Sequence, residues 1–152
     1  MSESNQPRVV VDTNQFVSGL IVKQGKSHEL IQLWQGNRFR LVTSPALREE
    51  LTRVLRHGKA VRKYGVSPEE VEALLVLVET FSLKVSPRRT VPLAVRDPKD
   101  TMVLAAALGN ADYLVTGDDD LLVLADDPRL GQLRILTVTA FLNILKEPSE
   151  GR

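Results

Sequence analysis

The stretch Val9-Val10-Val11-Asp12-Thr13-Asn14 decides the fold class of this chain. Three consecutive valines, with no polar residue alternating between them, predict a short strand that is buried on both faces. An aspartate follows the strand at once, and Asn14 to Val22 has the pattern of a helix. The segment Tyr113-Leu114-Val115-Thr116-Gly117-Asp118 again places an aspartate after an apolar strand. Open α/β sheets bind ligands at the carboxyl ends of their strands, so Asp12 and Asp118 are expected at one edge.

Further strands and helices alternate along the rest of the chain. Short apolar runs predict strands at 40–43, 83–85 and 134–137, and helical periodicity predicts helices at 27–34, 45–56 and 98–108. Ser44-Pro45 and Ser67-Pro68 each combine an N-cap residue with proline at the first helical position, and Thr139 is expected to cap a last helix to about Lys146. This alternation predicts an α/β fold, a three-layer α/β/α sandwich around a central, mostly parallel sheet of about five strands.

The size and composition fit one globular unit. The chain has 152 residues, of which 43% are hydrophobic and 26% charged, and we expect a single domain over 1–152 with an ordered core at about 8–146. No apolar run approaches the roughly 20 residues that cross a bilayer, and we expect no signal peptide before Val9. Without cysteine there are no disulfides and no thiolate ligands, and two histidines are too few for a usual zinc site. A cytoplasmic protein without a membrane partner is therefore expected.

The charged residues are segregated, although the net charge is only +1. Between Asp97 and Asp127 there are eight aspartates and a single base, Lys99. Between Arg48 and Lys63 there are six lysine or arginine residues against two glutamates. The first segment is suited to hold cations and the second to meet an anionic partner, although a basic segment of this kind is equally typical of a solvated helix face.

The aspartates have two interpretations. Singly, each is typical of a helix terminus, because Asp12 and Asp97 precede predicted helices and Asp100 lies in a first helical turn. Together, several carboxylates at one edge of a sheet repel one another and usually need a cation at neutral pH. An all-oxygen ligand set selects a hard divalent ion such as Mg²⁺ or Mn²⁺. The leading hypothesis is therefore a divalent-metal site.

Two further groups of acids are candidates for this site. On a helical projection of residues 45–56, Glu50 lies at the border of the apolar stripe and Glu49 points away from it. A glutamate bordering a buried face is uncommon unless it is paired or bound to metal, so Glu50 is the better candidate ligand. In the run Asp118-Asp119-Asp120, the first and third side chains are expected to face the site while Asp119 faces water. A polar turn that caps the following segment is an equally good alternative.

The order and spacing of these motifs resemble the PIN domain, a metal-dependent nuclease fold found in many bacterial toxin–antitoxin toxins. The resemblance covers about Val9 to Leu145. Its pieces, in chain order, are Val9-Val10-Val11-Asp12-Thr13-Asn14, Ser44-Pro45 through Glu50-Leu51, Asp97-Pro98-Lys99-Asp100, Val115-Thr116-Gly117-Asp118, and Ile135-Leu136-Thr137 before a short helix. None of the family's acids is missing, so nothing in the motif indicates an inactivated member.

The resemblance implies a role for each acid and its neighbours. The catalytic acids would be Asp12, Glu50, Asp100 and Asp118, and the metal ligands would be Asp12, Asp100, Asp118 and the additional acid Asp120. Polar residues beside these acids would support them, namely Thr13, Asn14, Asp97 and Thr116, with Ser44 in a similar position. Contacts to the RNA backbone are expected from the basic segment, at Arg53, Arg56, Lys59, Arg62 and Lys63.

These roles imply an endoribonuclease that hydrolyses phosphodiester bonds with Mg²⁺ or Mn²⁺, and more specifically the toxin of a type II toxin–antitoxin pair. The implied partners are an RNA substrate, a cognate antitoxin and a second copy of the chain in a homodimer. The main alternative is a PIN-like module that binds RNA or a partner without cleaving. An aspartate-nucleophile phosphatase is disfavoured, because the position two residues after Asp12 is Asn14 rather than a second aspartate.

Overall fold

A five-stranded parallel sheet forms the centre of the computed structural model, which describes residues 6–147. The strands are β1 (Arg8–Val11), β2 (Arg40–Thr43), β3 (Leu83–Lys84), β4 (Tyr113–Val115) and β5 (Arg134–Leu136). Their order is β3-β2-β1-β4-β5, and every neighbouring pair is parallel. The predicted α/β fold is confirmed, and the sheet is entirely rather than mostly parallel. Residues 1–5 and 148–152, the ends of the expected 1–152 unit, lie outside the described part.

Helices connect the strands, and most begin where the sequence predicts a cap. They are α1 (Thr13–Ile21), α2 (Lys26–Gln35), α3 (Pro45–His57), α4 (Lys59–Lys63), α5 (Pro68–Phe81), α6 (Pro98–Ala107), α7 (Asp119–Leu122), the 3-10 helix η2 (Pro128–Leu130) and α8 (Val138–Lys146). Ser44 and Ser67 cap α3 and α5 as predicted. The predicted cap of α8 at Thr139 is wrong. Thr137 accepts from the backbone N–H of Ala140 at 3.1 Å instead, because β5 ends one residue earlier than expected and leaves Thr137 free to cap.

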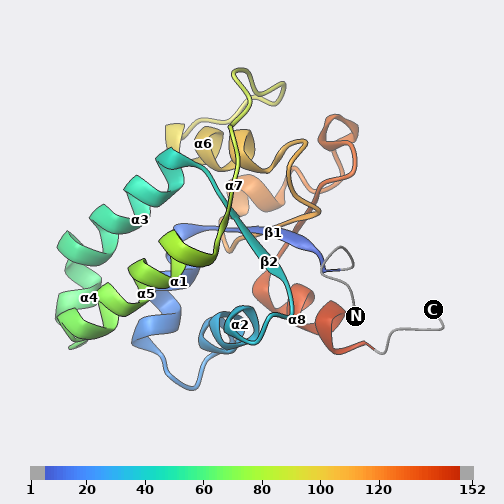
Figure 1. Cartoon of the computed structure of the whole chain (residues 1–152). Helices are drawn as coiled ribbons and strands as arrows, with labels where there is room; N and C mark the ends of the chain where they lie inside the picture. The colour runs from blue at the N-terminus through green and yellow to red at the C-terminus, as the bar shows by residue number, and fades with distance from the viewer. Residues whose placement is uncertain (1–5, 148–152) are drawn as a thin grey trace.

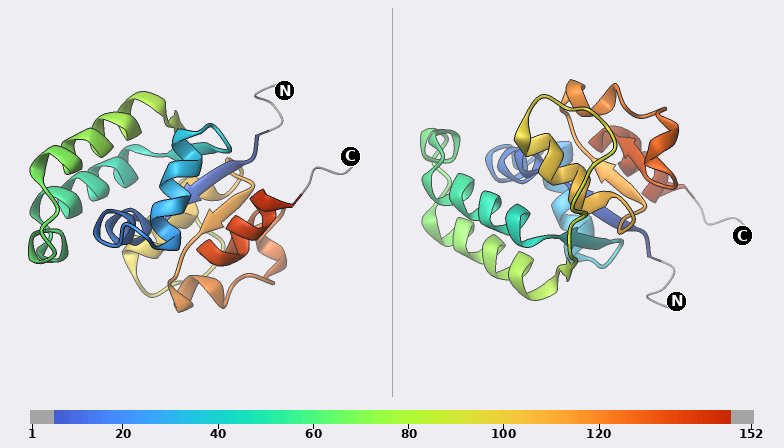
Figure 2. Two further views of the ribbon diagram at one scale, coloured as in Figure 1. Left: turned by 90° about the horizontal axis from the view of Figure 1, so that it is seen from below. Right: turned by 90° about the horizontal axis from the view of Figure 1, so that it is seen from above.

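Alternate residues of the strands point into two separate layers of helices. Val9 and Val11 pack with α1, α2 and α8 on one face, whereas Val10 and Leu114 pack with α6 and α7 on the other. Figure 1 shows α1, α2 and α8 on the opposite side of the sheet from α6 and α7, and the two views of Figure 2 show the same three layers. Strands covered on both faces have no exposed side for polar residues, which explains the unbroken apolar runs of the sequence.

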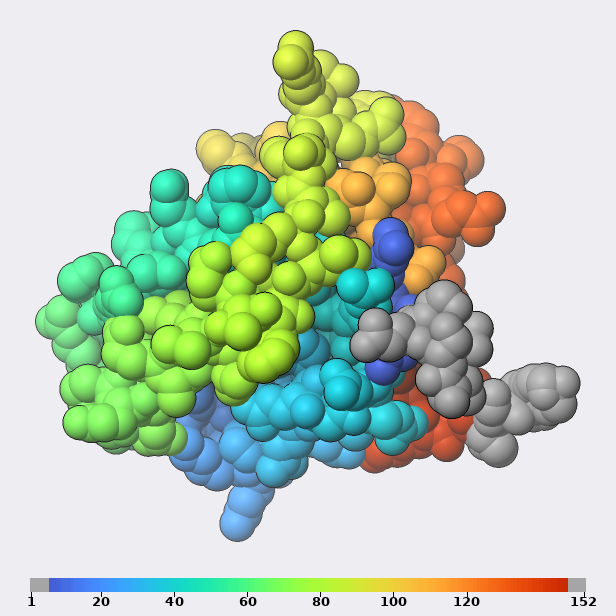
Figure 3. Space-filling view, viewed as in Figure 1, coloured from blue at the N-terminus to red at the C-terminus, as the bar shows by residue number. Residues whose placement is uncertain are grey.

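The α3 and α5 helices form a pair that extends from the sheet, with α4 at the tip of the pair (Figure 1). Their facing apolar side chains are buried, including Leu51, Leu55, Val71, Leu74 and Val78. The opposite end of α3 approaches α6. The segment between β3 and α6 projects from the surface (Figure 3). No helix within residues 6–147 is both long and apolar enough to span a lipid bilayer.

Phe141 of α8 is the centre of an aromatic cluster. Its side chain is fully buried, and its ring centroid lies 5.3 Å from that of Phe39, edge to face, and 5.2 Å from that of Tyr113. Tyr113 belongs to β4, so the last helix is anchored to a strand inside the sheet. Aromatic pairs of this kind contribute about 0.5–1.5 kcal/mol beyond the burial of their area. The α8 helix is therefore part of the core.

Replacing Phe141 with alanine should lower the free energy of unfolding by about 3–5 kcal/mol, because it removes a fully buried ring and leaves a cavity. Urea unfolding followed by circular dichroism measures this loss. Val123 is 78% exposed, so Val123→Ala serves as the control and should change the free energy by less than about 0.5 kcal/mol. We propose that residues 8–146 unfold as one unit. Equal unfolding midpoints for the two variants would contradict the place of α8 in that unit.

Candidate metal centre

The order of the strands changes direction between β1 and β4. From β1 the chain passes through α1 and α2 to β2 on one side, and from β4 it passes through α7 to β5 on the other side. Connections that leave two adjacent strands in opposite directions mark the position where open α/β sheets bind ligands. The backbone N–H of Asp12 donates to the carbonyl of Val115 at 3.0 Å. The first aspartate is therefore held directly beside the end of β4.

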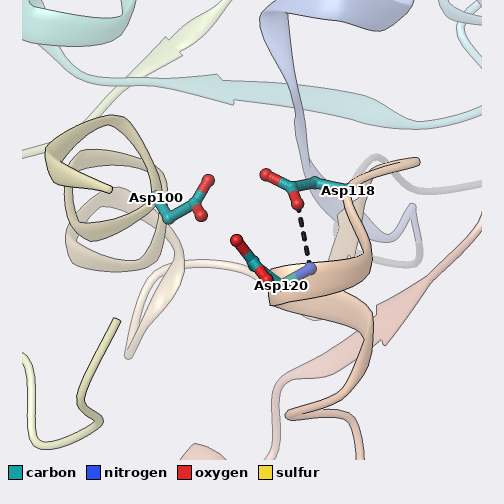
Figure 4. A group of neighbouring side chains, drawn as sticks. All are labelled: Asp100, Asp118 and Asp120. Carbon is teal, nitrogen blue, oxygen red and sulfur yellow. Dashed lines mark hydrogen bonds between the residues drawn. The ribbon is translucent and has the colours of Figure 1, made fainter. Parts of the chain in front are cut away.

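Three of the predicted metal ligands converge near this point. Asp100, Asp118 and Asp120 each offer a carboxylate oxygen, and these oxygens all lie within 4.8 Å of one another. Figure 4 shows Asp100 on α6 pointing across toward Asp118 and Asp120 at the start of α7. The backbone N–H of Asp120 donates to Asp118 Oδ1 at 2.9 Å, so Asp118 caps α7 and also belongs to this three-acid group. Asp119 is exposed, as predicted.

Thr116 links the first aspartate to the three-acid group. Its side chain is fully buried, and its hydroxyl donates to Asp12 Oδ2 at 2.7 Å and accepts from the backbone N–H of Asp118 at 3.0 Å. Asp12 also caps α1, because its Oδ1 accepts from the backbone N–H of Asn14 at 3.5 Å. Asp12 thus lies next to the three-acid group without being a member of it. One buried hydroxyl orients two of the predicted acids.

The environment of the Asp100 carboxyl disfavours its negative charge. The residue is 4% exposed, and its Oδ2 is buried without a hydrogen-bond partner among residues 6–147. Burial first, and then the nearby carboxyls of Asp118, Asp97 and Asp12, raise the pKa of Asp100 from 3.8 to about 7. A divalent cation in the group would give Oδ2 a partner and cancel the repulsion, and carboxylate oxygens are the ligands that Mg²⁺ and Mn²⁺ prefer. The residues therefore fit a hard divalent ion.

Other predicted supporting residues lie around the group. Asp97 is exposed and caps α6, accepting from the backbone N–H of Lys99 at 2.9 Å. Thr13 is buried at the start of α1, whereas Asn14 is exposed. The position of Asp97 has two effects on Asp100, because it fixes the helical turn that carries this acid and adds a negative charge beside it.

Glu50 lies at the border of the buried face of α3, as the helical projection predicts. Its side chain is 14% exposed, whereas Glu49 is exposed. Arg53 Nη2 lies 2.6 Å from Glu50 Oε1, and Lys99 Nζ lies 3.5 Å from Glu50 Oε2. Glu50 is outside the three-acid group. Because Lys99 directly precedes Asp100, its ion pair ties α3 to the turn of α6 that carries the buried acid.

Two cations beside the acids were missed by the sequence analysis, which assigned cations to the basic segment alone. Arg96 Nη2 donates to Asp120 Oδ1 at 3.2 Å, and Lys99 contacts Glu50 as described. The signal that points to them is their spacing, because both lie within four residues before Asp100 on the predicted helix start. A helix start that places Asp100 in a site also places the residues just before it near that site.

The basic segment lies mostly away from the acids. Figures 1 and 2 show α4 at the end of the α3–α5 pair that is remote from α6. On α4, the side chains of Lys59, Arg62 and Lys63 are exposed. Arg56 donates to both carboxylate oxygens of Glu72 at 2.8 Å each, and this pair raises the pKa of Arg56 and lowers that of Glu72. Part of the basic charge therefore joins α3 to α5.

The fold and the acidic group define an α/β protein with a carboxylate site suited to a divalent cation. The PIN domain profile matches residues 8–120, most of the chain, and the chain belongs to the PIN domain family. The matched range contains all the candidate site acids, which are Asp12, Glu50, Asp97, Asp100, Asp118 and Asp120. PIN domains are generally nucleases, so the family supports a nucleic acid as the substrate. The uncharacterized protein MJ1680 of Methanocaldococcus jannaschii is 28% identical over 120 residues, which cover 79% of this chain and 76% of the relative.

The raised pKa of Asp100 implies that its charge destabilises the metal-free protein at neutral pH. The folded protein keeps the proton on this carboxyl up to about pH 7, whereas the unfolded chain loses it near pH 3.8. Between these values the folded state binds more protons than the unfolded state. The free energy of unfolding therefore falls as the pH rises, and this fall ends above about pH 7.

The variant Asp100→Asn removes this ionisation and keeps the size of the side chain. In EDTA at pH 8 we expect it to melt at least about 2 °C above the unmodified protein, with the difference vanishing near pH 4. Differential scanning fluorimetry across this pH range measures the effect. Asp119→Asn, at an exposed position outside the three-acid group, should show no such trend. A lower melting temperature for Asp100→Asn at pH 8 would refute the electrostatic argument.

Proposed function

We propose that this protein is an endoribonuclease that uses Mg²⁺ or Mn²⁺ held by Asp12, Asp100, Asp118 and Asp120. The observation that carries the proposal is the buried Asp100 carboxyl in a member of the PIN domain family. It faces two further acids, and its Oδ2 has no hydrogen-bond partner within residues 6–147. An arrangement that raises the pKa of a carboxyl to about 7 is unfavourable for folding, which is typical of residues retained for function.

The side chains divide the work as follows in this proposal. Asp100, Asp118 and Asp120 hold the metal directly, and Asp12 holds it directly or through water while Thr116 fixes its orientation. Bound there, the ion would activate a water, neutralise the phosphate oxygens and stabilise the leaving oxygen. Glu50, at the border of the site and paired with Lys99, orients the attacking water or completes the ligand set.

Asp97, Thr13 and Asn14 have supporting roles in the same proposal. Asp97 positions the first turn of α6 as its cap, and the other two residues form the start of α1, which Asp12 caps. None of the three needs to touch the metal for this role. Their contribution is to keep Asp12 and Asp100 in place, because the two acids sit on helix starts whose directions these residues set.

The basic segment is proposed to contact the RNA backbone, and apart from Arg53, which lies beside Glu50, it does so at a distance from the cleaved bond. Its residues Arg53, Arg56, Lys59, Arg62 and Lys63 run from the middle of α3 to the tip at α4. Contacts of lysine and arginine with phosphates raise affinity without selecting a sequence, and they weaken as salt increases. This segment therefore extends the stretch of RNA that the protein contacts and does not select which bond is cleaved.

The proposed biological setting is a type II toxin–antitoxin pair in the cytoplasm, with the protein as a homodimeric toxin. The support is the resemblance of its motifs to toxin PIN domains and an acidic site that a basic antitoxin segment can neutralise. The neighbouring reading frame tests this setting, since a toxin requires a small antitoxin protein. If the neighbouring reading frame encodes no antitoxin, we propose instead that the protein is a nuclease of general RNA metabolism.

Asp12→Asn and Asp100→Asn should each reduce metal-dependent RNA cleavage by more than about 100-fold, beyond the 10- to 100-fold effect typical of outer partners of a metal. Incubation of total RNA with the purified protein and Mn²⁺, followed by mapping of the product ends, measures the rate and the target. Asp119→Asn is the matched control and should keep its activity, because Asp119 is an exposed acid next to the group. Undiminished cleavage by both variants would remove these acids from the mechanism. RNA binding without cleavage by the unmodified protein would favour the non-cleaving module.

Metal binding should also be visible without any substrate. An ion at 100 times its Kd stabilises the folded state by about 2.7 kcal/mol, which raises the melting temperature of a chain of this size by roughly 5–10 °C. We expect this response to millimolar Mn²⁺ at pH 8 and its loss in Asp118→Asn. A melting curve that is unchanged by the metal in the unmodified protein would contradict the site.

A further inference from the structure

Two cations lie at the edge of the three-acid group, on the chain that enters α6. Arg96 Nη2 lies 3.2 Å from Asp120 Oδ1, and Lys99 Nζ lies 3.5 Å from Glu50 Oε2. Their side chains are 88% and 62% exposed, whereas Asp100 in the same stretch is buried. The start of α6 thus directs one carboxylate inward and two cations toward solvent. We call Arg96 and Lys99 the cationic rim.

The backbone holds the rim in a defined position relative to the acids. Asp97 caps α6 and accepts from the backbone N–H of Lys99, and Pro98 occupies the first helical position. The apolar side chains of α6 that follow are buried, including Val103, Leu104, Ala106 and Ala107. Lys99 and Asp100 are therefore adjacent residues of an anchored helix. A ligand at the acidic group lies within reach of the rim because Lys99 adjoins Asp100 on α6 and Arg96 contacts Asp120.

The present partners of the rim hold it only weakly. Ion pairs between exposed side chains contribute about 0–1 kcal/mol, and the Arg96–Asp120 pair is of this kind. In the proposed function Asp120 is also a metal ligand, so its charge is shared with a divalent ion when one binds. The planar guanidinium of arginine matches the paired oxygens of a phosphate, and lysine binds phosphate as a point charge. The rim is thus available for the anionic groups of a substrate.

We propose that Arg96 and Lys99 bind the RNA phosphates next to the cleaved bond, and that Arg96 exchanges Asp120 for a phosphate oxygen when Asp120 binds metal. This inference rests on the proposed nuclease function and deepens it. It implies that RNA and metal bind cooperatively, because each favours the state in which Arg96 has left Asp120. The rim differs in role from the basic segment at α4, which is remote from the acids.

RNA binding without cleavage tests the phosphate contacts. Fluorescence anisotropy of a labelled single-stranded RNA, with Ca²⁺ in place of Mn²⁺, gives the affinity and its dependence on salt. Arg96→Gln and Lys99→Gln should each weaken binding about 3- to 10-fold and reduce the slope of log affinity against log salt by about 0.7. Arg89→Gln is the matched control, because Arg89 is exposed in the segment before α6 and pairs with no acid among residues 6–147; it should change the affinity less than about twofold. Unchanged RNA affinity, or weaker RNA binding with an unchanged salt slope, would contradict the proposed contacts of Arg96 and Lys99 with phosphates.

Metal binding without RNA tests the exchange at Asp120. In calorimetric titrations with Mn²⁺, Arg96→Gln should bind the ion about 2- to 5-fold more tightly than the unmodified protein, because the guanidinium no longer competes for the carboxylate. Lys99→Gln should change the Mn²⁺ affinity less than Arg96→Gln does, since its partner Glu50 is outside the three-acid group whereas Asp120 belongs to it. An equal or lower Mn²⁺ affinity for Arg96→Gln would overturn the exchange. Mn²⁺ binding by the unmodified protein, together with unaltered RNA binding in both variants, would contradict the phosphate contacts of Arg96 and Lys99 but leave the metal site standing. An unmodified protein that does not bind Mn²⁺ would contradict the metal site itself.

Discussion

The burial of the Asp100 carboxyl beside the other acids is the interaction on which the site depends. A single exposed aspartate at a helix start stabilises the fold as a cap and through the helix dipole. Asp100 lies in the first turn of α6 but is not its cap, since Asp97 has that role, and it points inward among acids. The fold keeps a group there whose charge is repelled by its neighbours and whose Oδ2 has no hydrogen-bond partner in the described part of the chain. A cation there would resolve both problems at once, so the geometry that disfavours the charge of Asp100 is also the geometry that suits a divalent ion.

The remainder of the fold makes this geometry possible. Short strands buried on both faces bring the ends of β1 and β4 together, and the backbone contact between Asp12 and Val115 sets their register. The buried hydroxyl of Thr116 then bridges Asp12 and the backbone of Asp118, so the positions of the acids that follow the two strands are linked by hydrogen bonds. The α6 helix supplies the third acid from above the sheet, held by an apolar surface that is buried nearly all along its length. The acids are thus positioned by apolar packing together with the hydrogen bonds of one buried hydroxyl.

Local patterns in the sequence were sufficient for the strands, the helix caps and the position of Glu50. Each of these depends on residues within one turn or one strand. The apolar runs at Val9 and Tyr113 therefore predict the strands, and the Ser-Pro pairs predict the helix starts. The error at Thr139 has the same origin, because two threonines lie near the start of α8 and only the exact end of β5 decides between them. The approach of Asp100 to Asp118 and Asp120 joins segments that no local pattern relates. The strand ends indicated a shared acidic site, and the resemblance to a family supplied the role of each acid. Arg96 was missed because the direction of an exposed side chain depends on the acid that it meets in space.

The positions of Arg96 and Lys99 also bear on a difficulty that any acidic site for RNA must overcome. Carboxylates that attract a divalent ion repel the phosphates of the substrate, and in the metal-free state this repulsion is strongest at the bond to be cleaved. A distant basic surface such as α4 does not remove it, because exposed charges separated by more than a Debye length of about 8 Å are largely screened. Arg96, which enters α6, and Lys99, which adjoins Asp100, are close enough to act, and their pairing with Asp120 and Glu50 reduces the negative potential before a substrate arrives. Opposite charges on one helix start therefore allow a single short segment to favour both the metal and the phosphate.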